Sequence, residues 1–162
     1  MNPDLNVLLD KAIQIAAASH AGQIDKSGLP YITHPLRIMA DAQGLEVQIV
    51  AVLHDVLEDT ATTADDLRRA GFSEALLASL ALVTHRPEES YADYVVNCKA
   101  DPVARQVKLG DLKDNSRLDR TMLRVGRIDG DFARIHRYLL SYQFLTDALG
   151  ETDYRALMAK YG

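Results

Sequence analysis

A group of ionisable side chains follows a mostly apolar stretch, residues 47–53, in the first half of the chain. His54 and Asp55 place an imidazole beside a carboxylate, and two more carboxylates, Glu58 and Asp59, follow one helical turn later. Carboxylates avoid apolar surroundings unless a partner compensates for their lost hydration. A bound metal ion would be such a partner, so this cluster predicts a metal site.

The spacing within the cluster suggests a division of labour. If the cluster lies on one helix, His54 stands above Glu58 and Asp55 above Asp59, because residues four apart share a helical face. One of these two columns could bind a metal ion while the other transfers protons. Two ligands do not hold a divalent ion against water, so we expect further ligands from elsewhere in the chain.

Two distant residues are candidates for the missing ligands. His34 lies at the start of a predicted helix, directly before a proline, which is a rigid position for an imidazole. Asp111 shares a helical face with Lys108 and Asn115, at spacings of three and four residues. Gly110 costs about 1 kcal/mol of helix propensity relative to alanine, a cost that the helix would tolerate if the backbone there must approach another element closely.

Apolar residues recur at helical spacing through the chain, and alternating β patterns and internal repeats are absent from the sequence. We therefore expect an all-α protein of about eight or nine helices, forming one domain over residues 1–162. Caps, prolines and glycines mark the expected helix ends, and a loop is expected at 22–30. The expected helices cover residues 5–20, 33–43, 46 into the His54–Asp55 cluster, 63–71, 73–83, 91–98, 101–118, 131–149 and 152–161.

Length and charge limit the possible functions. A chain of 162 residues with 48% hydrophobic residues is long enough to bury one substantial core. Its net charge of −5 argues against a nucleic-acid partner, because nucleic-acid binding needs a basic face. No window reaches the roughly 18 apolar residues of a membrane span, so we expect a cytoplasmic protein without a membrane partner. The single cysteine, Cys98, is expected to pack as a small hydrophobe.

Four separated blocks of the sequence carry a resemblance to a known family. They are Ala-Gly-Gln at 21–23, Lys-Ser-Gly-Leu-Pro-Tyr-Ile-Thr-His-Pro at 26–35, His-Asp-Val-Leu-Glu-Asp-Thr at 54–60 and Lys-Leu-Gly-Asp at 108–111. In this order they resemble the HD-superfamily hydrolase domain of the Rel/SpoT alarmone enzymes. In length and lack of a synthetase part, the chain resembles the stand-alone small alarmone hydrolases. A lone His-Asp pair would be a weak signal, whereas four ordered blocks are specific.

The resemblance implies an HD-type helical fold and removal of the 3′-pyrophosphate from a nucleotide alarmone. It also implies a divalent metal ion, typically manganese, held by four side chains: His34, His54, Asp55 and Asp111. Glu58 and Asp59 would act at the attacking water and the leaving oxygen, with the division of their roles left open. Two imidazoles with two carboxylates suit manganese, iron or zinc better than calcium or magnesium, which agrees with this implication.

Three further residues are candidates for binding a small-molecule nucleotide substrate. Lys26 and Lys108 are expected to neutralise phosphates, and Asn115 to hydrogen-bond the sugar or a phosphate. The sequence departs from the bifunctional enzymes of the family, because Asp25-Lys26 stands where they carry Arg-Lys. Residues 110–115 read Gly-Asp-Leu-Lys-Asp-Asn in place of Ala-Asp-Arg-Leu-His-Asn. The base is therefore open between guanosine, as in (p)ppGpp, and adenosine, as in (p)ppApp.

Alternative interpretations stay open. The four metal candidates could form a buried polar network without a metal ion. The domain could bind a nucleotide for regulation without hydrolysing it, or act as a broader nucleotide phosphatase. Tyr138 and Tyr142 could stack on a base, although aromatic residues at helical spacing are more often core. His20 is expected to cap or pack at the end of the first helix and His136 to be exposed, so neither is expected to bind metal. His85 could belong to a loop over the pocket, although a structural turn is the simpler interpretation, and the oligomeric state is not predicted.

Overall fold

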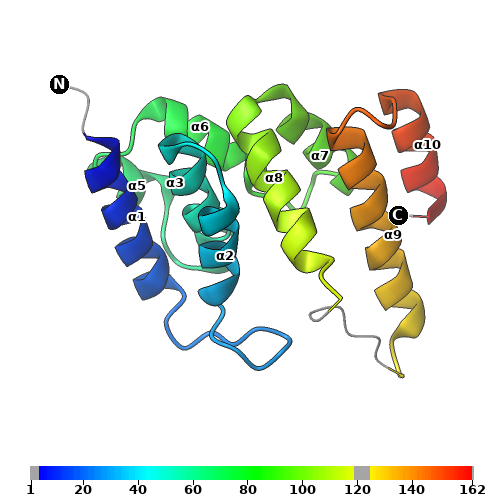
Figure 1. Ribbon diagram of the computed structural model, residues 1–162, viewed down its shortest axis with the longest axis horizontal. Helices are drawn as coiled ribbons and strands as arrows, with labels where there is room; N and C mark the ends of the chain where they lie inside the picture. Colours follow the sequence, from blue (N-terminus) through cyan, green and yellow to red (C-terminus); the bar gives the residue numbers. More distant parts are fainter. Residues whose placement is uncertain (1–3, 119–124, 162) are drawn as a thin grey trace.

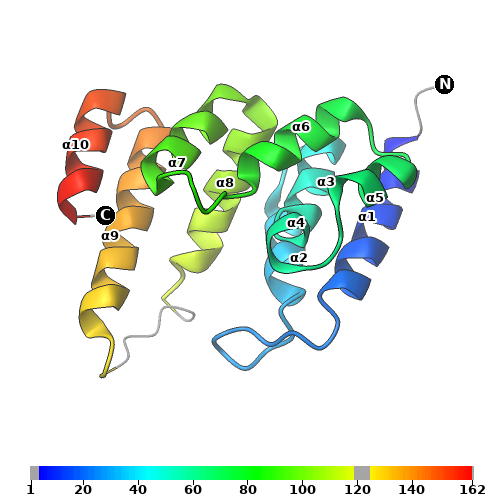
Figure 2. The same cartoon turned by 180° about the vertical axis from the view of Figure 1, so that it is seen from behind.

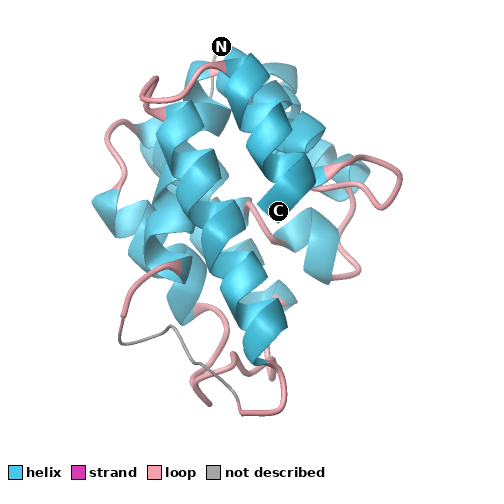
Figure 3. Cartoon of the chain, turned by 90° about the vertical axis from the view of Figure 1, so that its right-hand side faces the viewer, coloured by secondary structure: helices cyan, strands magenta, loops and turns pink. Residues whose placement is uncertain are grey.

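Helices make up the regular structure of this computed structural model, which describes residues 4–118 and 125–161. That part of the chain contains no strand (Figure 3), only an isolated β-bridge between Ile24 and Pro30. None of its helices is both long and apolar enough to span a membrane. The all-α fold predicted from the sequence is confirmed. The helices are α1 (Leu5–Ser19), α2 (Thr33–Asp41), α3 (Leu45–Leu53), α4 (Val56–Asp59), α5 (Ala64–Arg69), α6 (Glu74–Val83), α7 (Tyr91–Ala100), α8 (Pro102–Asn115), α9 (Ile128–Leu145) and α10 (Glu151–Tyr161).

Helix α3 lies at the centre of one half of the molecule, packed against α1, α2, α6 and α8 (Figure 1). Its residues from Ile49 to Leu53 are all buried, because this part of the helix is apolar on every side and other helices enclose it. Helix α8 separates this half from α9 and α10, while Figure 2 shows α4, α6 and α7 on the opposite face. The core therefore fixes the end of α3, directly before the His54–Asp55 pair.

Polar caps begin several helices where the sequence predicts them. Thr63 forms a capping box with Asp66 at the start of α5, and the Ser73 hydroxyl accepts a backbone N–H at the start of α6. Asp101 caps α8, and Pro102 lies in its first turn, where a missing N–H costs no hydrogen bond. These helix starts were predictable because each signal is local.

The helix expected to continue through the cluster is interrupted. Helix α3 ends at Leu53, the backbone turns at His54 and Asp55, and the single-turn helix α4 follows. The described residues therefore contain ten helices, and the prediction of one continuous helix was wrong. At the interruption, the Asp55 carboxylate accepts a 2.7 Å hydrogen bond from the hydroxyl of Tyr31. The spacing of apolar residues along a helix gives no information about such a tertiary contact.

Two later helices end at other residues than predicted. Helix α8 stops at Asn115 rather than Leu118, because the next N–H bonds back to carbonyl groups of the last turn. Helix α9 runs from 128 to 145 in place of 131 to 149. Its end lies near Asp147, whose φ of +63° is a left-handed conformation typical of the residues that follow a helix.

Gly110 allows α8 to lie close to α2. A Cβ atom at this position would be 2.8 Å from Cγ2 of Ile38, well inside the normal contact distance between carbon atoms. The close backbone approach predicted from this glycine is confirmed. It brings Asp111 of α8 beside His34 of α2.

Candidate metal centre

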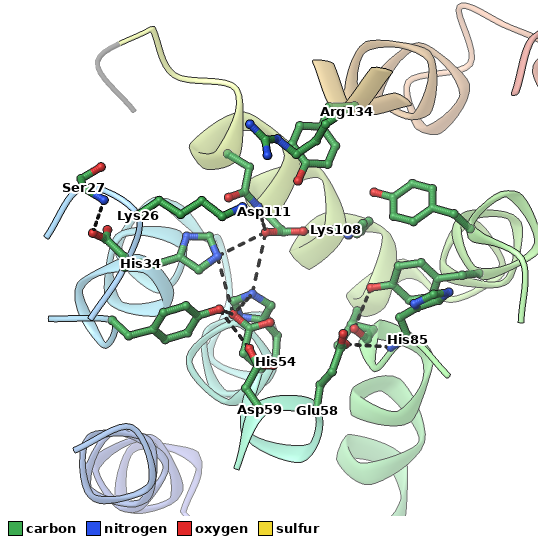
Figure 4. Close-up of a pocket in the computed structure, with 18 of the residues that line it drawn as sticks. Lys26, Ser27, His34, His54, Glu58, Asp59, His85, Lys108, Asp111 and Arg134 are labelled. Atoms are coloured by element: carbon green, nitrogen blue, oxygen red, sulfur yellow. Dashed lines mark hydrogen bonds and ion pairs between the residues drawn. The ribbon is translucent and has the colours of Figure 1, made fainter. Parts of the chain in front are cut away.

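A cavity of about 510 Å³ lies among α2, α4, α8, α9 and the loop that precedes α2. Its lining contains every residue that the sequence predicts for the site, as the close-up in Figure 4 shows for most of them. These residues are Lys26, His34, His54, Asp55, Glu58, Asp59, Lys108, Asp111 and Asn115. Residues far apart in the sequence thus share one cavity.

The four candidate metal ligands converge within this cavity, and Figure 4 labels three of them, His34, His54 and Asp111. Single atoms of His34, His54 and Asp111 all lie within 4.8 Å of one another. Oδ2 of Asp55 lies 3.0 Å from Nε2 of His54 and 3.7 Å from Nε2 of His34. Oδ1 of Asp111 lies 3.3 Å from Nε2 of His34 and 3.9 Å from that of His54. Two imidazole nitrogens and two carboxylate oxygens therefore face one small volume.

Hydrogen bonds on the far side of each imidazole orient its Nε2 atom toward this volume. Nδ1 of His54 lies 2.8 Å from the carbonyl oxygen of Ala51, which only accepts, so the proton of the neutral ring belongs on Nδ1. Among the residues that the structure describes, the buried Nε2 of His54 has no hydrogen-bond partner, although it lies at ion-pair distance from Asp55. A lone pair facing carboxylates is repelled unless a cation lies between them. The residues therefore fit a divalent metal ion.

Without a metal ion, the carboxylates attract protons to the imidazoles. Burial by itself would lower the pKa of His34, but Asp111 and Asp114 raise it to about 10. Burial would raise the pKa of Asp111, but Lys108 and the two imidazoles hold it well below its usual range. The site thus favours positive charge, which a divalent cation would supply in place of the protons.

Two residues of α8 hold the carboxylate of Asp111. Lys108 donates from Nζ to Oδ2 at 2.7 Å, and Asn115 donates from Nδ2 to Oδ1 at 2.5 Å. Lys108 is buried, with Nζ 4.8 Å from the centre of the Tyr94 ring. The predicted shared face of these three residues is confirmed, and within it Lys108 and Asn115 orient Asp111.

Glu58 and Asp59 face different parts of the cavity. Oε2 of Glu58 accepts the backbone N–H of His85 at 3.0 Å, and burial raises the pKa of this carboxyl group. Oδ2 of Asp59 accepts the hydroxyl of Tyr31 at 3.2 Å. The helix interruption removes the two aligned columns expected from the sequence. Glu58 nevertheless keeps a place in the cavity, with a pKa shifted toward the range useful for proton transfer.

Asp25 shapes the loop that carries Lys26. Its Oδ1 accepts the backbone N–H groups of Ser27 at 2.8 Å and Leu29 at 3.0 Å, as aspartate does in tight turns. This carboxylate therefore builds the loop at the position where the bifunctional enzymes of the family carry an arginine. The side chain of Lys26, next in the chain, lines the cavity.

Three residues of the site were not predicted. The hydroxyl of Tyr31 bonds to Asp55, Arg134 enters the cavity from α9 (Figure 4), and Asp114 contacts the outer nitrogen of a candidate metal ligand. Tyr31 lies inside one of the four sequence blocks, which was a usable signal. Arg134 lies one helical turn before Tyr138, which also lines the cavity. Asp114 gave no local signal.

The remaining aromatic and histidine candidates differ in whether they line the cavity and in how far they are buried. Tyr138 lines the cavity, whereas Tyr142 is absent from the described lining, so the expected pair of stacking rings is reduced to one. His20 is buried, with its ring centre 4.9 Å from that of Tyr31, and packs at the end of α1 as predicted. His136 is exposed, also as predicted.

Comparisons with curated proteins find similar proteins, although no protein-family model matches the chain. A guanosine-3′,5′-bis(diphosphate) 3′-pyrophosphohydrolase of Aquifex aeolicus is 33% identical over 66% of this chain and 17% of its own length. A GTP pyrophosphokinase of Streptomyces coelicolor is 32% identical over 72% of this chain and 15% of its own length. The Escherichia coli bifunctional (p)ppGpp synthase/hydrolase SpoT is 42% identical over 38% of this chain and 9% of its length. The chain thus spans only a small part of these relatives.

A solved structure gives a match over the whole chain. It is described as a metazoan ortholog of SpoT that hydrolyses ppGpp, and it superimposes with a TM-score of 0.69. The match covers 100% of this chain and 98% of the other at 21% sequence identity. At this identity the likeness shows a shared fold.

Proposed function

We propose, from the premise that this chain is a homologue of the Rel/SpoT alarmone enzymes, that it is a metal-dependent hydrolase acting on a nucleotide alarmone. It would remove the 3′-pyrophosphate of (p)ppGpp or (p)ppApp, as one cytoplasmic HD-type domain. One relative is named a 3′-pyrophosphohydrolase, and the protein that shares the fold is described as hydrolysing ppGpp. The observation that carries the proposal is the convergence of two imidazoles and two carboxylates in one cavity.

His34, His54, Asp55 and Asp111 would hold one divalent ion. We propose Mn²⁺, because a mixed set of nitrogen and oxygen ligands suits it better than Mg²⁺ or Ca²⁺. When bound, the ion supplies acidity for a water molecule and positive charge beside the phosphoryl oxygens. The two carboxylates would balance the charge of the ion while the neutral imidazoles complete the set.

The proposed reaction cleaves the bond between the ribose 3′-oxygen and its phosphorus. A water oxygen bonds to that phosphorus, one water proton passes to a carboxylate and then to solvent, and the leaving 3′-oxygen takes a proton from solvent. Glu58 would orient the water and take its proton, because a raised pKa favours proton transfer near neutral pH. Asp59 would assist at the leaving oxygen. The products are pyrophosphate and a nucleoside 5′-diphosphate or 5′-triphosphate with a free 3′-hydroxyl.

Side chains from three elements would bind the substrate. Lys26 from the loop and Arg134 from α9 supply cations for the phosphates (Figure 4). Lys108 would add its charge through Asp111, its hydrogen-bond partner, and Asn115 would bond the sugar or a phosphate. The Asp25 carboxylate is hydrogen-bonded within its own loop, and an aspartate offers no cation on which a base could stack. This position therefore does not select the base. Both guanosine and adenosine alarmones therefore belong to the proposal.

Pyrophosphate release from ppGpp and ppApp tests the proposal, with Mn²⁺ present and after chelation. We expect release from at least one alarmone, lost on chelation and restored by Mn²⁺, with no phosphate from ordinary mononucleotides. Phosphate release from mononucleotides at a similar rate would instead indicate a broader phosphatase. Tight binding of an alarmone without turnover in any divalent metal would overturn the enzymatic proposal and indicate a regulatory nucleotide-binding module.

A further inference from the structure

We propose that Asp114, held by Arg37, is a positioning residue that fixes the His34 imidazole in the orientation needed to bind the metal ion. The inference rests on the metal centre of the proposed function. It adds Arg37 and Asp114 to that centre, and neither residue lies in any of the four sequence blocks. One of them departs from the family pattern, since Asp114 stands where the bifunctional enzymes carry the histidine of Ala-Asp-Arg-Leu-His-Asn.

Short hydrogen bonds join these three side chains between α2 and α8. Oδ2 of Asp114 lies 2.7 Å from Nδ1 of His34. Arg37 donates from Nε to Oδ1 of Asp114 at 2.7 Å and from Nη2 to Oδ2 at 3.0 Å. Asp114 is only 6% exposed. A bidentate guanidinium contact at a buried carboxylate fixes the carboxylate plane, and the plane fixes the direction of the imidazole.

The position of Asp114 decides which nitrogen of His34 faces the cavity with a lone pair. An ionised carboxylate only accepts, so Nδ1 donates and Nε2 is left for the metal, facing Asp111 and Asp55. Two N–H groups of the Arg37 guanidinium donate to the oxygens of Asp114, which is the contact an ionised carboxylate makes.

Arg37 also sets the charge balance of the pair. Its side chain is 29% exposed and, with Asp114, lines a second cavity on the side of α2 and α8 away from the metal centre. Its positive charge cancels the carboxylate, so the pair contributes orientation to the centre without adding net negative charge. Neutral replacement of one residue alone leaves the charge of the other unbalanced, whereas the double variant Arg37→Gln/Asp114→Asn keeps the net charge and therefore tests orientation alone.

Metal affinity in the absence of substrate tests the inference. We would titrate Co²⁺ against a competing chelator and follow the visible spectrum of native protein, Asp114→Asn and Asp114→Ala. Affinity should fall about 10–100-fold, the range for residues that orient metal ligands. Asparagine offers one acceptor oxygen to two donors, so it should lose most of the effect. Arg37→Gln should show a smaller loss, and the double variant Arg37→Gln/Asp114→Asn little more than Asp114→Asn, because both residues act through His34.

Asp147→Asn is the matched control, since it removes a carboxylate that binds Lys99 and Arg105 at the surface. It should leave Co²⁺ affinity unchanged. Nitrogen-15 NMR of the Zn²⁺-loaded protein should show the His34 proton on Nδ1 in native protein and a changed Nδ1 signal in the Asp114 variants. Circular dichroism with chelator present separates these effects from loss of folding, and the isosteric Asn variant decides the case where Asp114→Ala does not fold.

Native Co²⁺ affinity in a folded Asp114→Asn variant would overturn the inference, as would an equal loss in Asp147→Asn. These outcomes are independent of hydrolysis. Native protein that binds Co²⁺ as expected but releases no pyrophosphate from any alarmone would contradict the proposed function and leave the positioning role intact.

Discussion

Nε2 of His34 on α2 lies 3.3 Å from Oδ1 of Asp111 on α8, although a large part of the chain separates the two residues. The contact depends on the close packing of two helices at Gly110. A substitution of either side chain should therefore alter the metal centre directly. A substitution at Gly110 should alter it indirectly, by moving the backbone of α8.

Asp111→Asn should weaken Mn²⁺ binding by more than about 100-fold, beyond the range for residues that only orient ligands. It also removes the carboxylate partner of buried Lys108, which should lower the free energy of unfolding by about 3 kcal/mol or more. Electron paramagnetic resonance titration of Mn²⁺ and denaturant unfolding with chelator measure the two effects. Native Mn²⁺ affinity in this variant would exclude Asp111 as a ligand.

Gly110→Ala should destabilise the protein in spite of the higher helix propensity of alanine. The propensity gain is about 1 kcal/mol, whereas overpacking against Ile38 costs about 1–3 kcal/mol. Because α8 must move away from α2, Mn²⁺ affinity should fall too. Gly130→Ala on α9 is the control, since its added Cβ meets no described atom of another element within 4 Å, and it should be neutral or stabilising. Equal behaviour of both variants in thermal unfolding would show that the contact does not matter.

Glu58→Gln should lower kcat for pyrophosphate release by about 10²–10⁴-fold, the usual contribution of a general acid–base group. Mn²⁺ affinity should stay near the native value, because this carboxylate bonds to the His85 backbone rather than to the metal centre. Glu74→Gln, at an exposed carboxylate paired with Arg68, provides the matched control and should leave kcat unchanged. A Glu58→Gln variant with native kcat would remove Glu58 from the mechanism.

Mn²⁺ affinity should increase as the pH rises from about 6 to 8. The carboxylates raise the pKa of His34 to about 10, so below that pH a proton competes with the metal ion for the imidazole. Binding should therefore release protons, and fewer protons compete as the pH rises. Isothermal titration calorimetry in buffers with different ionisation enthalpies measures this release. Heats that do not depend on the buffer would show that the imidazole is already neutral before binding.

Most of the fold was predictable because its signals are local. Apolar spacing and caps such as Thr63 and Ser73 give the helices, and Gly110 indicated a close approach that the structure contains. The grouping of His34 with Asp111 came from the order of the sequence blocks and not from local pattern. Periodicity alone does not indicate which helices become neighbours.

The parts that were not predictable depend on tertiary contacts. The interruption at Asp55 coincides with a hydrogen bond from Tyr31, which helical periodicity does not register. Asp25 had an obvious charge but no visible partner, and only the folded loop shows its carboxylate bonded to backbone N–H groups. Asp114 is of the same kind, since its partners His34 and Arg37 lie on another helix.

X-ray diffraction from crystals grown with Mn²⁺, with an anomalous map calculated near the manganese edge, tests the metal centre most directly. We predict one anomalous peak, at direct coordination distance from Nε2 of His34 and His54 and from carboxylate oxygens of Asp55 and Asp111. A map with no peak among these four side chains, or with its peak elsewhere in the molecule, would contradict the metal centre and the function proposed from it.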